Sequence, residues 1–113
     1  MCIIISANDI IEINKKFDKG HVVNKSSLDF AISSSDRSKD WITQLAYLVR
    51  AILIDHIFEE GNKRTATALI SSVLELHKIA YDPIRIDKLI IQIVINNIID
   101  LTLIRRLIKD VIR

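Results

Sequence analysis

Residues 56–69, HIFEEGNKRTATAL, bring together side chains that could act on a phosphate group. His56 can accept a proton near neutral pH, which suits a general base acting on a hydroxyl. Glu60 offers the carboxylate with which a protein holds a divalent cation such as Mg²⁺, whereas we interpret the adjacent Glu59 as an ordinary surface charge. Gly61 is one of only two glycines in the chain and lets the backbone approach a ligand closely.

A helix is expected to begin directly after this glycine, with Asn62 at the position of its cap. The first backbone amides of a helix have no partner within it and, with the helix dipole, attract an anion. Lys63 and Arg64 add two cations at the end of the helix that disfavours cations unless an anion is bound. The sequence therefore predicts that residues 61–64 (Gly61, Asn62, Lys63 and Arg64) bind phosphate.

Two long helices are expected to position this stretch. The helix before it has the stronger periodicity, with one apolar face built from Ile42, Leu45, Ala46, Val49, Ile52 and Leu53 and ending in phase at His56. The helix after it has a face built from Ala66, Leu69, Ile70, Val73, Leu76 and Ala80. Asp82 and Pro83 are expected to end it, and the two helices should pack together.

The rest of the chain is also predicted to be helical. Ser6 and Asp9 resemble a capping box before a short helix, and Ser26 suggests the start of a second, shorter one. Two further helices are predicted over residues 87–97 and 102–113.

Non-helical structure is expected in few places. The serine-rich residues 33–40 contain no apolar side chain, so they are expected to form an exposed loop. Only residues 3–5 and 20–24 show any tendency to pair as strands. The prediction is an all-α fold with one domain over residues 1–113, because this length supports a single core.

Composition excludes several classes of function. The net charge of +2 is too small for a general electrostatic attraction to nucleic acid or to a membrane surface. The longest apolar stretch, residues 89–104, is interrupted by polar side chains, so no membrane span and no signal peptide are predicted. Cys2 is the only cysteine and is expected to be inert. Because one cysteine cannot form an internal disulfide, a cytoplasmic setting is expected.

The order His-x-Phe-x-(Asp/Glu)-Gly-Asn-x-Arg resembles the signature of the Fic/Doc family, whose members transfer part of a nucleotide to protein hydroxyls. The matching residues are His56, Phe58, Glu60, Gly61, Asn62 and Arg64. The resemblance implies that His56 is the general base, that Glu60 holds Mg²⁺ and that ATP is the co-substrate. Phe58 would anchor the turn in the core.

The motif departs from the AMP-transferring Fic branch at two positions. Lys63 stands where that branch has a second glycine, and Thr67 stands where it has a second arginine. The run Asn-Lys-Arg-Thr-Ala is similar to the Doc toxin branch, in which the nucleotide binds in the reverse direction and its terminal phosphate is transferred. The resemblance therefore implies a protein kinase.

The resemblance also implies partners. The Doc branch acts on elongation factor Tu and halts translation, so a translation factor is the expected protein substrate. A flexible flap over residues 17–40 would pair with that substrate like an added strand. Ser71 and Glu75 have the spacing of the family's inhibitory motif, but the residue after Glu75 does not fit. A separate antitoxin protein is therefore expected to restrain the enzyme.

Two other functions compete with the kinase. One is AMP transfer to a protein hydroxyl, which Thr67 disfavours. The other is a non-catalytic protein with the same fold that binds a nucleotide or a partner. The remaining candidates favour structural roles: His21 and His77 lack partners at metal-ligand spacing, and Trp41 suits a helix start better than a platform for a base.

Overall fold

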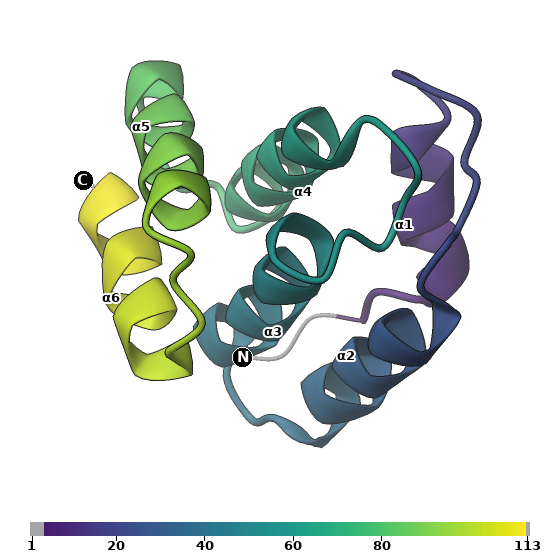
Figure 1. Cartoon of the computed structure of the whole chain (residues 1–113). Helices are drawn as coiled ribbons and strands as arrows, with labels where there is room; N and C mark the ends of the chain where they lie inside the picture. Colours follow the sequence, from purple (N-terminus) through teal and green to yellow (C-terminus); the bar gives the residue numbers. More distant parts are fainter. Residues whose placement is uncertain (1–3, 113) are drawn as a thin grey trace.

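The computed structural model describes residues 4–112, and these residues form six α-helices. In chain order they are α1 (Ala7–Asn14), α2 (Lys25–Arg37), α3 (Trp41–Leu53), α4 (Asn62–Leu76), α5 (Pro83–Ile95) and α6 (Leu101–Val111) (Figure 1). Extended pairing within the described range is limited to two isolated bridges, Val22 with Phe58 and Tyr81 with Ile112. The predicted all-α fold class is confirmed.

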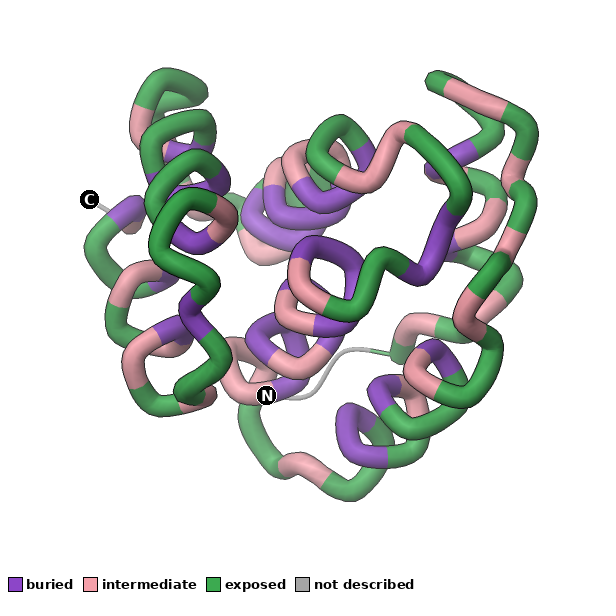
Figure 2. The backbone as a smooth tube through the Cα atoms, in the orientation of Figure 1, coloured by how far each residue is buried: buried purple, intermediate pink, exposed green. Residues whose placement is uncertain are grey.

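The core forms around α3, which lies in the middle of the molecule (Figure 1). Helices α2, α4 and α6 all pack against it, so the expected contact between the two helices that flank the motif is confirmed. Leu45, Leu48, Val49 and Ile52 of α3 are fully buried. Figure 2 shows the buried residues of the surrounding helices on the sides that face this centre, because burial of apolar area drives the packing.

Helix α1 begins as the sequence predicts. The Ser6 hydroxyl accepts a hydrogen bond from the Asp9 amide, and the Asp9 carboxylate accepts one from the Ser6 amide. Both bonds of a capping box are thus present. Of the two stretches with strand tendency, residues 20–24 contribute only Val22 to a bridge; Ile4 and Ile5 form no strand, and residue 3 lies outside the described residues, as does Cys2.

The prediction of an exposed loop over residues 33–40 is wrong. Helix α2 continues to Arg37, and Ser34 and Ser35 are buried. Gln44 of α3 donates a hydrogen bond from its side chain to the Ser35 carbonyl. A serine is small enough to allow two helices to approach closely, and its backbone is already paired within the helix, so the absence of apolar side chains did not prevent burial.

The predicted flap over residues 17–40 is also largely helical. Helix α2 begins after Asn24, whose side chain accepts a hydrogen bond from the Ser27 amide. Its 13 residues make it longer than the sequence suggested. Only residues 17–24 and 38–40 of the predicted flap lie outside helices.

The end of α4 also differs from the prediction. The helix ends at Leu76 and not at Asp82, because the chain turns at Lys78, whose φ of 57° is left-handed. Asp82 instead caps α5, and Pro83 is its first residue, a position where proline needs no amide hydrogen. Helix α5 therefore starts before the predicted residue 87.

The apolar stretch over residues 89–104 is divided between α5 and α6. Asn97, with a φ of 48°, lies in the turn between them. In the described part of the chain, every helix is too short or too polar to cross a membrane. Helix α6 ends at Val111, and Arg113, the predicted last helical residue, lies outside the described residues.

Candidate functional site

The stretch that carries the candidate chemistry is a turn between α3 and α4. Helix α3 ends at Leu53, so His56 lies in the turn and not at the end of the helix as predicted. The backbone of His56 is left-handed, with a φ of 50°, and its side chain is exposed. Ile57 and Phe58 follow and are buried. The buried pair fixes the turn to the core, as expected for Phe58, while His56 stays at the surface.

Asn62 closes this turn through its side chain. Its carbonyl oxygen accepts a hydrogen bond from the Phe58 amide at 3.1 Å, and its amide donates one to the Phe58 carbonyl at 2.9 Å. The cap position of α4 belongs to Gly61, so the placement of Asn62 as the cap is corrected. Because both hydrogen bonds of the Asn62 side chain lie within the turn, its backbone amide is the group of this residue that can face an anion.

Gly61 is required by its conformation and by its surroundings. Its φ of 78° is left-handed, a region that other residues rarely adopt. A Cβ atom at this position would lie 3.1 Å from the Asn14 side-chain nitrogen and 3.4 Å from the Asp18 Cβ. The backbone of the turn therefore lies directly against the end of α1.

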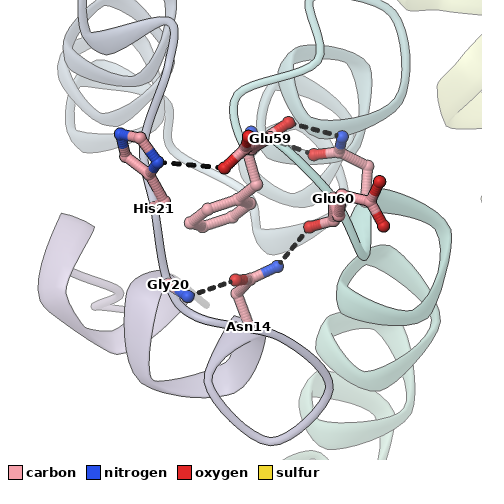
Figure 3. A network of polar contacts seen from close by, with 7 residues as sticks. Asn14, Gly20, His21, Glu59 and Glu60 are labelled. Atoms are coloured by element: carbon pink, nitrogen blue, oxygen red, sulfur yellow. Dashed lines mark hydrogen bonds and ion pairs between the residues drawn. The ribbon is translucent and has the colours of Figure 1, made fainter.

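Asn14 holds the turn from behind. It is fully buried, and its amide donates hydrogen bonds to the Glu60 carbonyl at 2.9 Å and to the Thr65 hydroxyl at 3.0 Å. Its carbonyl oxygen accepts a hydrogen bond from the Gly20 amide at 2.8 Å. Figure 3 shows this amide between the two chain segments, with the Glu60 carboxylate turned away from it. One side chain thus connects α1, the segment after it, the turn and α4.

Residues 20–24 run alongside the turn and pair with it. The Val23 amide donates to the Ile57 carbonyl, and the Glu59 amide donates to the His21 carbonyl. The His21 ring nitrogen Nδ1 lies 3.0 Å from the Glu59 carboxylate (Figure 3). Glu59 and His21 therefore fasten the turn to this segment.

All six predicted site residues line one hollow of about 420 Å³, which we call the polar hollow. They are His56, Glu60, Gly61, Asn62, Lys63 and Arg64. Phe17 and Asp18, which follow α1, complete its wall. The residues are close in sequence, but the structure adds that they face a common space.

Four of these side chains are available to a ligand. Within residues 4–112, His56, Glu60, Lys63 and Arg64 make no hydrogen bond or ion pair through their side chains. The neighbouring polar side chains of Asn14, Asn62 and Thr65, by contrast, are all engaged in holding the turn.

The start of α4 concentrates positive charge at the polar hollow. Among the six helices of the described range, α4 alone has no side-chain hydrogen bond to its first amides. Unpaired amides and the helix dipole create a positive potential there, and Lys63 and Arg64 increase it. Such an arrangement can bind an anion.

The carboxylates in the polar hollow fit Mg²⁺ that arrives with a phosphate. Glu60 and Asp18 both line it. The described residues contain no cluster of three or more potential ligands. Mg²⁺ in phosphate sites is commonly held by one or two carboxylates together with phosphate oxygens and water, so this donor set suits a metal that binds with a nucleotide.

Three contributors to the site were not identified from the sequence. Asn14 lies in phase with the apolar residues Ile10 and Ile13 of α1, which is the signal that could have marked it as buried. Phe17 lies beyond the end of α1 and was predicted as the first residue of the flap, not as part of the site. Asp18 gave no signal, because its place beside Gly61 depends on how α1 packs.

The other candidate residues lie away from the polar hollow. His77 follows α4 at its far end, where its ring stacks on Trp41 with a centroid distance of 4.6 Å. Trp41 is the first residue of α3, in agreement with the helix-start role predicted for it.

No family model, no curated protein and no solved structure matches the chain. The resemblance to the Fic/Doc family therefore depends on the residues of the motif. What the structure adds is their common hollow, their free side chains and the buried contacts that hold them.

Proposed function

We propose that this protein is a Fic/Doc-type phosphotransferase that moves the terminal phosphate of ATP to a hydroxyl of a protein substrate. The observation that carries this proposal is the polar hollow. An imidazole, a carboxylate and two cations face one space at the uncapped start of a helix, and none of the four is engaged elsewhere in the described chain.

In the proposed reaction, the substrate hydroxyl attacks the terminal phosphorus of ATP. A new oxygen–phosphorus bond forms, and the bond between that phosphorus and the bridging oxygen of ADP breaks, with its electron pair leaving on ADP. His56 accepts the proton that the hydroxyl loses. An exposed imidazole without a hydrogen-bond partner can turn toward an incoming hydroxyl, which suits a general base.

Charge neutralisation supplies the rest of the catalysis. Lys63, Arg64 and the first backbone amides of α4 would bind the phosphate oxygens, where negative charge redistributes during transfer. Glu60 would hold Mg²⁺, which supplies further charge neutralisation when bound. The fixed backbone around Gly61 keeps these donors in place, so little free energy is needed to orient them during the reaction.

Thr67 favours phosphate transfer over AMP transfer. Its hydroxyl donates to the Lys63 carbonyl at 2.9 Å within α4, and the residue carries no positive charge where the AMP-transferring branch has its second arginine. By resemblance, we propose that the protein is a cytoplasmic toxin, that its substrate is a translation factor such as elongation factor Tu, and that a separate antitoxin restrains it.

The test is expression of the parent and of His56→Ala, followed by growth measurements and intact-mass analysis of elongation factor Tu. We expect growth arrest and an added phosphate with the parent, and a roughly 10²–10⁴-fold slower transfer with His56→Ala. His77→Ala, at the other end of α4, is the matched control and should stay active. Circular dichroism should show equal helix content in all three proteins.

Each alternative gives a different result. An added nucleotide on the substrate would assign AMP transfer. If His56→Ala arrests growth as strongly as the parent, the protein acts by binding and the proposed transfer is wrong.

A further inference from the structure

A second hollow adjoins the polar hollow. It has a volume of about 470 Å³ and lies between α4 and α5, beside Phe17; we call it the apolar hollow. Phe17, Lys63 and Arg64 line both hollows. Ala68, which lies one turn after Arg64 on the same face of α4, lines only the apolar one. The two hollows are therefore adjacent along α4 and share part of their walls.

The wall of the apolar hollow has the composition of a site for a flat heterocycle. Phe17 is 39% exposed, so an aromatic face is available for stacking. Ile90 and Ile91 of α5 supply aliphatic surface, and Ile91 is 55% exposed. Nucleic-acid bases stack on aromatic side chains and bury their faces against such surfaces.

One carboxylate interrupts this apolar wall. Asp87 of α5 lines the hollow, and its side chain has no hydrogen bond or ion pair within residues 4–112. An ionised carboxylate can only accept hydrogen bonds. It therefore selects a ligand that has a donor group on its edge, such as the amino group of adenine.

We infer that the apolar hollow binds the base of the nucleotide, with Phe17 stacked on the ring and Asp87 accepting a hydrogen bond from its amino group. This inference rests on the proposed function, because it uses the phosphate site in the polar hollow. It identifies the ligand as a nucleoside triphosphate whose base carries an amino group.

The order of the two hollows gives the direction of the nucleotide. His56, Asp18 and Glu60 line only the polar hollow, whereas Ala68 and Asp87 line only the apolar one. Lys63 and Arg64 lie between them. A nucleotide with its base beside Asp87 extends its phosphates past these cations, and its terminal phosphate is the one that reaches His56. The same arrangement would keep the α-phosphate, the group needed for AMP transfer, further from His56.

Calorimetry with three ligands tests the inference. ATP, inosine triphosphate and inorganic triphosphate are each titrated in Mg²⁺ into the parent, Phe17→Ala and Asp87→Ala. Inosine triphosphate has the same phosphates as ATP but no amino group on its base. Ile95→Ala is the matched control, because Ile95 lies on α5 outside both hollows and is 75% exposed.

We expect the parent to bind ATP more tightly than the other two ligands. Phe17→Ala should weaken ATP binding roughly tenfold, since loss of stacking on an aromatic ring has about this effect. It should weaken inorganic triphosphate much less, because the Phe17 ring lines the polar hollow without offering a hydrogen bond to a phosphate. Asp87→Ala should remove the preference for ATP over inosine triphosphate. Ile95→Ala should bind all three ligands like the parent. Triphosphate binding that persists also shows that a variant is folded.

Two results would overturn the inference, and they are distinguishable. If the parent binds inorganic triphosphate as tightly as ATP, or if the variants lose both equally, the base is not in the apolar hollow, although the phosphate site stands. If the parent binds none of the three ligands, the phosphate site and the proposed function fail together.

Discussion

The starts of α3 and α4 show two different ways of fixing a helix. Helix α3 is capped by its own neighbour in the chain: the Asp40 carboxylate accepts hydrogen bonds from the Thr43 amide and the Thr43 hydroxyl, both at 2.8 Å. Helix α4 begins at Asn62, and Gly61 at its cap position provides no side-chain hydrogen bond. The turn before it is held by Asn14, which donates to the Glu60 carbonyl from 46 positions earlier in the chain.

This difference determines whether the first backbone amides of each helix remain available to a ligand. At α3, the carboxylate that fixes the helix also occupies the Thr43 amide and places a negative charge there, which disfavours an anion. At α4, the fixing contacts lie behind the turn, at the Glu60 carbonyl and the Thr65 hydroxyl. The front of α4 can therefore be firmly placed and still be free to bind an anion.

Removing the contact behind α4 should have the largest effect. Asn14→Ala leaves the Glu60 carbonyl and the Gly20 amide without their partner and should lower the free energy of unfolding by about 2–4 kcal/mol. Asn8→Ala, at an exposed position of the same helix, is the control and should change it by less than about 0.5 kcal/mol. Urea denaturation measures both. Equal effects would mean that Asn14 does not hold the turn.

A substitution at Gly61 should have the next largest effect. Gly61→Ala forces a side chain into a left-handed backbone and toward Asn14, and should lower the free energy of unfolding by about 1–2 kcal/mol. Gly61→Asn is informative beside it, because asparagine adopts this conformation more readily than alanine. If the alanine variant is as stable as the parent, the turn must have a different backbone from the one described.

Removing the cap of α3 should cost about 1 kcal/mol in Asp40→Ala, without any effect on nucleotide binding. Burial alone raises the pKa of Asp40, but the hydrogen bonds from Thr43 and the charge of Arg105 outweigh it, so the pKa lies below its ordinary value of 3.8. A carboxylate with a lowered pKa stabilises the fold above its unfolded pKa and loses this effect as the pH falls through its folded pKa.

The difference in stability between Asp40→Ala and the parent should therefore be full near neutral pH and shrink at pH values below about 4. Thermal unfolding over this range measures it. A difference that stays constant into strong acid would show that the carboxylate is not the stabilising group.

Reversing a charge at the start of α4 should have the smallest effect on stability, and this effect should be stabilising, unlike those of the other substitutions. Lys63→Glu replaces an unfavourable cation with a favourable anion and should raise the free energy of unfolding by about 0.3–1 kcal/mol. The same change should abolish binding of MgATP. Lys88→Glu, within α5, is the control and should bind like the parent. A Lys63→Glu protein that binds ATP normally would contradict the phosphate site at α4.

Much of the helical fold could be predicted because its signals are local. The capping box at Ser6 and the apolar face of α3 depend on residues three or four positions apart. The motif residues were also predictable as neighbours, since they lie within nine positions of each other. They line one hollow because they are close in sequence and because the chain turns between α3 and α4.

The remaining features depend on contacts between distant segments. Asn14 contacts Thr65 across 51 positions of sequence, and Asp87 lines the apolar hollow only because α5 packs beside α4. The burial of Ser34 and Ser35 arises from the close approach of α2 to α3, which composition did not indicate. The cap of α4 was misplaced by one residue because Asn62 bonds backward to Phe58 and not forward into the helix.

The long reach of Asn14 also determines when the site can exist during folding. A peptide covering only the turn and α4 would contain every motif residue, yet it would lack the partner that orders the Glu60 carbonyl. Closing a loop of this size costs chain entropy before any contact is gained. The nascent protein should therefore lack a binding-competent turn until its first helix has returned to dock beside α4.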